Sequence, residues 1–219
     1  MIGHDVPTLR FRSFHRLMTS LMAVVVGGAV AVHAEELSTS GSRTVAGSTS
    51  ASRTPVRSGL VKGAYIPTFY SRAVTGPLMN KSVCYVCRNG QRPVVMLLMR
   101  RMTPAMRPLL KNIDRIVDGK RAYGLRTFGV LISEEPSDAL PIVQTFAFNG
   151  KITMPLTVAT EAVSAPSCQN VHGDAALTIV LYHKRRAVSS IALRADELDK
   201  QHIRDALKSV QNFANNVRW

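Results

Sequence analysis

Apolar residues follow a strand-like pattern and then a helix-like pattern in the middle of the chain. Residues 94–99 form an unbroken apolar run, which is typical of a strand covered on both faces. Thr103 suits an N-cap and Pro104 suits the first helical position. The apolar residues that then recur at helical spacing are Leu109, Leu110, Ile113, Ile116 and Val117. The pattern predicts a buried strand followed by an amphipathic helix that ends at Gly119.

A second strand and helix follow. The apolar and β-branched residues of 126–132 predict a strand. Residues 140–148 predict a helix, with Ser137 or Asp138 as its N-cap. Two strands of this kind, each followed by a helix, indicate parallel strands joined by right-handed crossovers.

The C-terminal part predicts a hairpin and a last helix. Residues 178–182 and 187–193 form two strand-like runs joined by a short basic turn. Asp196 is expected to cap the final helix. The element order is therefore β-α-β-α-β-β-α, which predicts an α/β domain with a mixed sheet flanked by helices.

The N-terminus carries the features of an export signal. Arg10, Arg12 and Arg16 precede an apolar stretch at 17–32, and small residues lead up to Ala34. This predicts a signal peptide cleaved near Ala34, because the apolar stretch is shorter than a membrane-spanning helix requires. The protein is accordingly expected to be exported, either to a periplasm or to the outside of the cell.

Composition divides the chain into three parts. Residues 1–34 are the predicted signal peptide, and residues 35–62 are rich in Ser, Thr, Gly and Arg. A segment with so few large apolar residues cannot bury enough surface to fold, so 35–62 are expected to form a flexible tether. Residues 63–219 then form one domain, and no segment in the mature chain is apolar enough to span a bilayer.

The chain is strongly basic, with 28 Lys and Arg against 14 Asp and Glu. Such a balance favours anionic neighbours. Nucleic-acid binding would call for aromatic side chains among the basic ones, and aromatic residues make up only 6% of the chain. We therefore expect no nucleic-acid partner and interpret the excess charge as a solvated basic surface.

Cys84 and Cys87 are the main candidates for chemistry. They stand two residues apart, shortly before the strand-to-helix junction at 99–104 where redox proteins often keep their thiols. In an exported protein such a pair is expected to form a disulfide. Lys81, Arg88 and Arg92 flank it, and positive neighbours favour a reactive thiolate. A small structural disulfide that closes the loop fits the same spacing.

A zinc site is a further alternative. Cys84, Cys87, Cys168 and His172 form a Cys3His set with permissible ligand spacings. Against it, the two halves lie far apart in the sequence and the expected compartment is oxidising. Cys168 is otherwise expected to be free, buried and inert. No phosphate-binding glycine loop, catalytic triad or carboxylate pair is evident, so no cofactor is expected.

The predicted order of elements resembles the thioredoxin-like fold over roughly residues 93–213. Pro108 resembles the proline that kinks the first helix of thioredoxins, and the hairpin at 178–193 resembles the hairpin that closes their sheet. The resemblance implies thiol–disulfide chemistry with a protein thiol or disulfide as the partner.

The chain departs from that family at its active-site positions. Counting back from Pro108, residues 100–103 (Arg-Arg-Met-Thr) stand where thioredoxins have Cys-Gly-Pro-Cys. Met106 stands where a peroxiredoxin would have its nucleophilic Cys, and Leu177 precedes Thr178 where the family has a cis-proline. Two hypotheses follow: thiol–disulfide exchange through Cys84 and Cys87, or a catalytically silent binding or structural module with a basic surface. The oligomeric state is left open.

Overall fold

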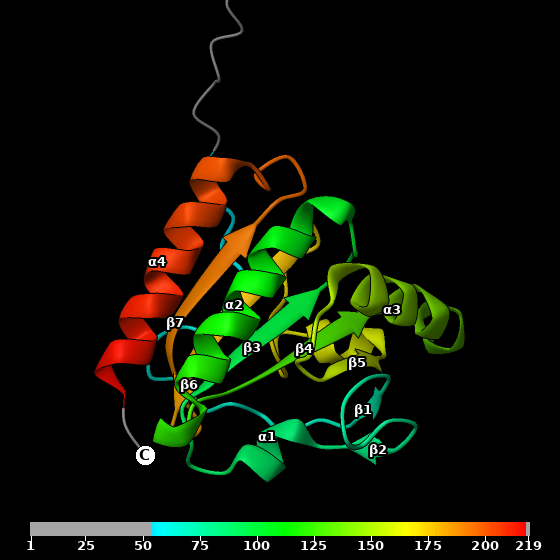
Figure 1. Cartoon of the computed structure of the whole chain (residues 1–219), viewed down its shortest axis with the longest axis horizontal. Helices are drawn as coiled ribbons and strands as arrows, with labels where there is room; N and C mark the ends of the chain where they lie inside the picture. The colour runs from blue at the N-terminus through cyan, green and yellow to red at the C-terminus, as the bar shows by residue number, and fades with distance from the viewer. Residues whose placement is uncertain (1–53, 218–219) are drawn as a thin grey trace, which may run out of the picture. The chain divides into compact units, whose positions relative to one another are not determined.

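A mixed sheet of seven strands forms the centre of the domain (Figure 1). The computed structural model describes residues 54–217, so the predicted signal peptide at 1–34 and residues 35–53 of the predicted tether lie outside the described residues. The strands are β1 (Ser71–Ala73), β2 (Ser82–Val83), β3 (Val94–Met99), β4 (Arg126–Ile132), β5 (Leu156–Ala159), β6 (Leu177–His183) and β7 (Arg186–Leu193). Their order across the sheet is β2-β1-β5-β4-β3-β6-β7. Strands β3, β4 and β5 are parallel, and the remaining neighbours pair antiparallel.

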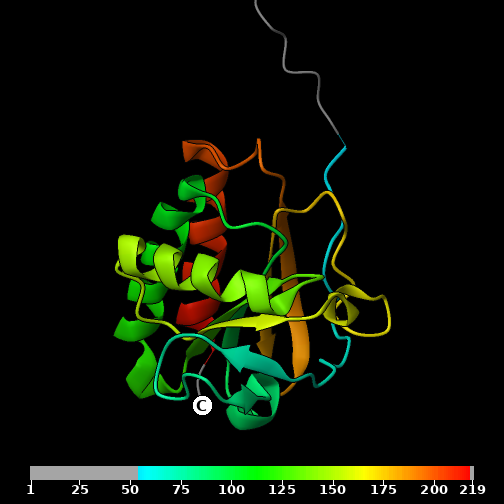
Figure 2. The same cartoon turned by 90° about the vertical axis from the view of Figure 1, so that its right-hand side faces the viewer.

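Three long helices cover one face of the sheet (Figure 2). They are α2 (Arg107–Gly119), α3 (Pro136–Gly150) and α4 (Lys200–Asn216). The other face is covered by a short helix, α1 (Tyr85–Asn89), by the segment that leads into β1 and by a helical turn, η3 (Glu161–Ser164). The predicted mixed sheet flanked by helices is thus confirmed, and the three long helices lie on the same side of it. The reason is that β3, β4 and β5 follow one another in the same direction, and right-handed crossovers then stay on one face.

Two apolar layers explain why β3 has no polar residue. Val95, Leu97 and Met99 belong to the cluster under the three long helices. The alternate residues of β3 belong to the cluster on the opposite face. A strand buried on both faces needs apolar side chains at every position, so the unbroken run at 94–99 was interpreted correctly.

The helix starts differ from the sequence prediction at two places. Helix α3 begins at Pro136 with Glu135 before it, rather than at a cap provided by Ser137 or Asp138. Helix α4 is capped by Asp199, whose carboxylate accepts the backbone N–H groups of Gln201 and His202 at 2.8 and 2.9 Å. Residues 194–197 instead form a turn closed by the side chain of Glu197, which leaves Asp196 before the helix.

The end of the predicted tether is seated on the domain. Ser58 is buried, with its hydroxyl 2.6 Å from the hydroxyl of Thr178 on β6. The same oxygen accepts the N–H of His172 at 2.9 Å. Gly59 adopts a φ of +86°, and a Cβ there would lie 2.8 Å from the hydroxyl of Ser190. Residues from about Ser58 onward are therefore held on the domain by specific contacts that composition cannot show, although the sequence placed them in the tether.

Within residues 54–217, no helix has both the length and the apolar character needed to cross a bilayer.

Candidate functional site

Cys84 and Cys87 are joined in a disulfide across the first turn of α1. Their Cα atoms are 5.3 Å apart. Cys84 is the N-cap residue of α1, and its sulfur accepts the backbone N–H of Cys87 at 3.1 Å. Cys168 is free and partly buried, and burial raises the pKa of its thiol. The predicted pairing is confirmed.

The two sulfur-bearing residues differ sharply in exposure. Cys84 is only 5% exposed and belongs to the apolar cluster on the face opposite the long helices, whereas Cys87 is exposed. Two neighbours fix this orientation. Tyr85 stacks on Phe128 of β4 with ring centroids 5.1 Å apart, and Val86 is fully buried. Since this packing holds the first turn of α1 against the sheet, Cys87 is left as the residue that solvent reaches.

The disulfide lies at the amino edge of the sheet, by which we mean the edge where the parallel strands begin. Helix α1 precedes β3, whereas α2 starts beyond the other end of β3 (Figure 1). Strand β3 has six residues, so about 20 Å of strand separates the two places. The expectation that the pair sits beside the strand-to-helix junction is therefore wrong. A short separation in sequence was taken for a short separation in space.

The carboxyl edge of the sheet, where the parallel strands end, carries no thiol at the helix start. Thr103 precedes a helical turn, η1 (Pro104–Met106), that leads directly into α2. Met106 is fully buried in the core. Arg100 makes two hydrogen bonds of 3.1 and 3.0 Å to the carboxylate of Glu161 and one of 3.2 Å to the carbonyl of Val171. These contacts hold the residue after β3 against η3 and the segment at Val171.

Similar architectures occur among solved disulfide oxidoreductases. A putative protein disulfide isomerase from Bacteroides thetaiotaomicron has a TM-score of 0.53 and 16% identity, over 73% of this chain and 94% of that one. A secreted Mycobacterium tuberculosis disulfide oxidoreductase homologous to E. coli DsbE has a TM-score of 0.50 and 9% identity, over 68% and 96% of the two chains. A DsbF homologue from Corynebacterium diphtheriae has a TM-score of 0.50 and 16% identity, over 67% and 87%. The chain has a thioredoxin-like fold. No family model and no curated protein matches the sequence.

In this thioredoxin-like domain the amino edge is strongly positive. Burial, followed by repulsion from Arg92 and Arg121, lowers the pKa of Arg126. The turn between β6 and β7 brings further cations, because the N–H of Lys184 donates to the carbonyl of Gln91 at 3.2 Å. The cations here, called the cationic edge below, are Arg88, Arg92, Arg121, Arg126, Lys184, Arg185 and Arg186. One acid, Asp118, lies 3.0 Å from Arg121.

The structure does not assemble the alternative zinc site. Cys84 and Cys87 are bonded to each other, so neither sulfur can act as a thiolate ligand. Within residues 54–217, no group of three or more His, Cys, Asp or Glu side chains is placed to hold a metal ion. His172 is exposed, and its Nδ1 accepts the N–H of Asp174 at 3.2 Å. The spacing of these residues along the chain suggested a zinc-ligand set, but the fold does not bring the four side chains together as one.

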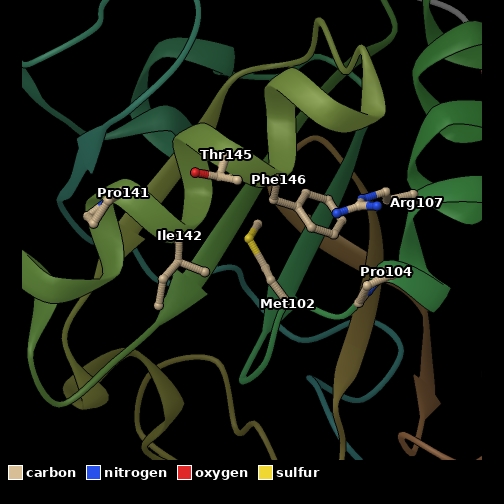
Figure 3. Close-up of a pocket in the computed structure, with 7 residues that line it drawn as sticks. All are labelled: Met102, Pro104, Arg107, Pro141, Ile142, Thr145 and Phe146. Atoms are coloured by element: carbon tan, nitrogen blue, oxygen red, sulfur yellow. The ribbon is translucent and has the colours of Figure 1, made fainter. Parts of the chain in front are cut away.

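A pocket of about 390 Å³ opens at the carboxyl edge between the start of α2 and α3 (Figure 3). Its lining residues are Met102, Pro104, Arg107, Pro141, Ile142, Thr145 and Phe146. The guanidinium carbon of Arg107 lies 5.5 Å from the centroid of the Phe146 ring. No pattern in the sequence indicates this pocket, because its two walls are separate helices that only the fold brings together.

Proposed function

We propose that the protein is an exported thiol–disulfide exchange protein that acts through Cys84 and Cys87, with Cys87 as the sulfur that meets the partner. The observation that carries this proposal is the exposure of Cys87 beside the burial of Cys84 in the same disulfide. Exchange requires a thiolate to reach one sulfur of the bond, so access selects Cys87.

The reaction transfers two electrons from a partner dithiol. A partner thiolate attacks the Cys87 sulfur, a mixed disulfide forms, and the sulfur of Cys84 leaves as a thiolate. A second partner thiolate then attacks the partner's sulfur in that mixed disulfide, and Cys87 leaves as a thiolate. The partner ends as a disulfide and the protein as a dithiol, with the two partner protons released or taken up by the new thiolates.

The cap of α1 supports Cys84 as the leaving group. Its sulfur already accepts the N–H of Cys87 at 3.1 Å, and this hydrogen bond is stronger to a thiolate than to a disulfide sulfur. A better stabilised leaving thiolate departs faster. Cys84 is therefore also the thiolate that closes the ring again in the reverse direction.

The charge around Cys87 favours an acidic protein partner. Arg88 follows Cys87 directly and the rest of the cationic edge lies at the same end of the sheet, and complementary charge raises association rates by about 10- to 1,000-fold at low salt. The need for a thiol or disulfide points to a protein rather than a lipid or a nucleic acid. Acidic dithiol peptides should therefore reduce the protein faster than basic peptides of matched length. To correct for differences in thiol reactivity, each peptide's rate with the protein is divided by its rate with a small neutral disulfide.

A charge-reversed variant separates steering from chemistry. Arg88→Glu combined with Lys184→Glu should remove the preference for acidic over basic peptides once each peptide rate is divided by the same variant's rate with mercaptoethanol, which corrects for any change in the reactivity of the disulfide itself. Arg204→Glu is the matched control, because α4 starts at the end of the domain away from α1 (Figure 1). High salt should abolish the preference in the parent protein. An unchanged preference in the double variant would contradict an acidic partner.

The decisive test of exchange measures the reduction potential of the disulfide and looks for mixed disulfides in variants that keep only one cysteine of the pair. The reduction potential of the pair is expected between about −120 and −270 mV. Cys84→Ala, which keeps the exposed Cys87, should accumulate mixed disulfides with a partner. Cys87→Ala, which keeps only the buried Cys84, should not. Cys168→Ala should behave like the parent protein. Mixed disulfides in Cys87→Ala but not in Cys84→Ala would reverse the assignment.

A second candidate function is a catalytically silent module that binds through its basic surface. The observation that favours it is the helix start at the carboxyl edge, where Thr103 and Met106 stand and no thiol is present. In that case the disulfide is a staple for α1, and its potential should lie below about −300 mV.

Export and domain limits belong to the same proposal. Residues 1–34 are the proposed signal peptide, followed by a tether and then the thioredoxin-like domain. N-terminal sequencing of the secreted protein should begin at Glu35. Recovery of the intact N-terminus from a membrane fraction would contradict cleavage.

A further inference from the structure

The pocket at the carboxyl edge has one charged group in an otherwise largely apolar lining. Arg107 is the first residue of α2, and the pocket's other lining residues are apolar apart from Thr145 (Figure 3). Among the described residues, the Nε of Arg107 has no hydrogen-bond partner although the atom is buried. No hydrogen bond or ion pair holds the rest of the guanidinium among the described residues either, so a bound carboxylate would supply an acceptor that the protein does not.

Packing holds this guanidinium in place. It lies over the buried ring of Phe146, 5.5 Å from the ring centroid. The stem of Arg107 also passes close to Gly150, where an added Cβ would lie 3.7 Å from its Cγ. A fixed guanidinium loses little side-chain entropy when it binds a carboxylate, and its planar donors match the two carboxylate oxygens.

The residues around Arg107 favour a ligand that has one negative charge and an apolar remainder. Met102 and the half-exposed Ile142 offer apolar surface next to Arg107. A second hollow adjoins the pocket and shares these two residues, and its lining carries Arg100 and Arg101 as well as Glu135 and Asp138. Arg100 is already bound to Glu161, whereas Arg107 is the one charged group among residues 54–217 that lines the pocket itself, so the charged end of a ligand in this pocket meets Arg107. One guanidinium in an apolar setting neutralises one charge, which suits a carboxylate better than a doubly charged phosphate.

We infer that this pocket binds a small apolar carboxylate, with its carboxylate on Arg107 and its apolar part against Met102 and Ile142. The carboxylate can belong to a free organic acid or to the C-terminal residue of a polypeptide with an apolar last side chain. The site is independent of the disulfide, which lies at the opposite edge of the sheet.

The test is a titration of the protein followed by backbone amide NMR. Hydrocinnamate should produce saturable shifts in residues 102–107 and 141–146, whereas its uncharged amide should not. Peptides that end in leucine, with a free or an amidated C-terminus, form the second arm. If hydrocinnamate binds, the ligand is a free acid. If only the free-terminus peptide binds, the ligand is a polypeptide end.

Variants identify the charged contact. Arg107→Gln should weaken hydrocinnamate binding about 10-fold or more, the scale of one lost charge-assisted hydrogen bond. Arg115→Gln, an exposed arginine on the same helix, is the matched control and should bind like the parent protein. Ile142→Asp changes an exposed position, so it tests the site even where Arg107→Gln disturbs folding. It should weaken binding of the acid by repulsion.

Some outcomes would overturn the inference. They are equal binding of the acid and the amide, unchanged binding in both Arg107→Gln and Ile142→Asp, or shifts confined to other parts of the domain. A double Cys84→Ala, Cys87→Ala protein should bind hydrocinnamate normally. Failure of the exchange function would therefore leave this site untouched.

Discussion

Replacing either cysteine of the pair by alanine breaks the same bond, yet the two substitutions should cost different amounts of stability. In both variants the ring that joins residues three positions apart is lost. Loop-closure entropy assigns about 2 kcal/mol to so short a ring. Cys87 is exposed, so Cys87→Ala should lose little more than this.

Cys84→Ala removes two further contributions. Its sulfur caps α1 by accepting the N–H of Cys87, and loss of an N-cap acceptor costs about 1 kcal/mol. The side chain is also buried in the apolar cluster, and removing one buried group of this size costs about 1 kcal/mol more. The total is about 4 kcal/mol, twice the cost for Cys87→Ala.

Thermal unfolding followed by circular dichroism measures the difference. A domain of this size loses about 2–4 °C in Tm for each kcal/mol, so Cys87→Ala should melt about 4–8 °C lower and Cys84→Ala about 8–16 °C lower. The reduced parent protein is the matched control, because it loses the ring and keeps both side chains. The Tm of the reduced parent protein should equal that of Cys87→Ala. Equal Tm values for the two variants would refute the assignment of Cys84 to the buried, capping role.

Other substitutions test the packing and the caps. Met106→Leu keeps the volume of a fully buried side chain, so it should cost less than ~1.5 kcal/mol in urea unfolding and leave exchange unchanged. Gly129→Ala would place a Cβ 2.7 Å from Cδ2 of Leu156, so crowding should cost about 1–3 kcal/mol in the same assay, and a neutral result would contradict the tight contact. Hydrogen bonds from the His202 backbone and side chain lower the pKa of Asp199, and the bond to Asp199 raises the pKa of His202. The aspartate's contribution is lost as pH falls through its lowered pKa, and the histidine's is lost as pH rises through its raised pKa. Asp199→Ala should therefore lower Tm most between about pH 4 and 6.5, and a pH-independent difference would contradict the pair.

The central part of the fold could be predicted from the sequence because its signals are local. The runs at 94–99 and 126–132 coincide with β3 and β4, since strands buried on both faces are largely apolar. In β4 the polar residues are confined to its start, at Arg126 and Thr127. Strand β5 was missed. It has four residues, too few for periodicity to separate it from a loop, and it is held by pairing with β4 and β1. The short strands β1 and β2 were missed for the same reason.

The candidate sites depend on contacts that no local pattern encodes. The disulfide between Cys84 and Cys87 was predictable, because a two-residue spacer keeps two sulfurs close. Which sulfur faces solvent was not, since it follows from Tyr85 stacking on Phe128, some forty positions away. The pocket around Arg107 was likewise invisible, because its other wall is α3.

The two proposed sites lie at opposite edges of the sheet, and each edge is built in a way that suits the chemistry proposed there. At the amino edge a short helix is held by a few side chains, so breaking the disulfide there disturbs α1 and leaves the sheet beneath it paired. At the carboxyl edge, Met106 is buried in the main core and Arg100 is held by Glu161, so the helix start is a rigid wall. A bond that opens and closes during exchange suits the first setting. A preformed pocket that binds a ligand without rearrangement suits the second. This protein thus keeps a thioredoxin-like sheet while its disulfide stands at the edge opposite the start of α2.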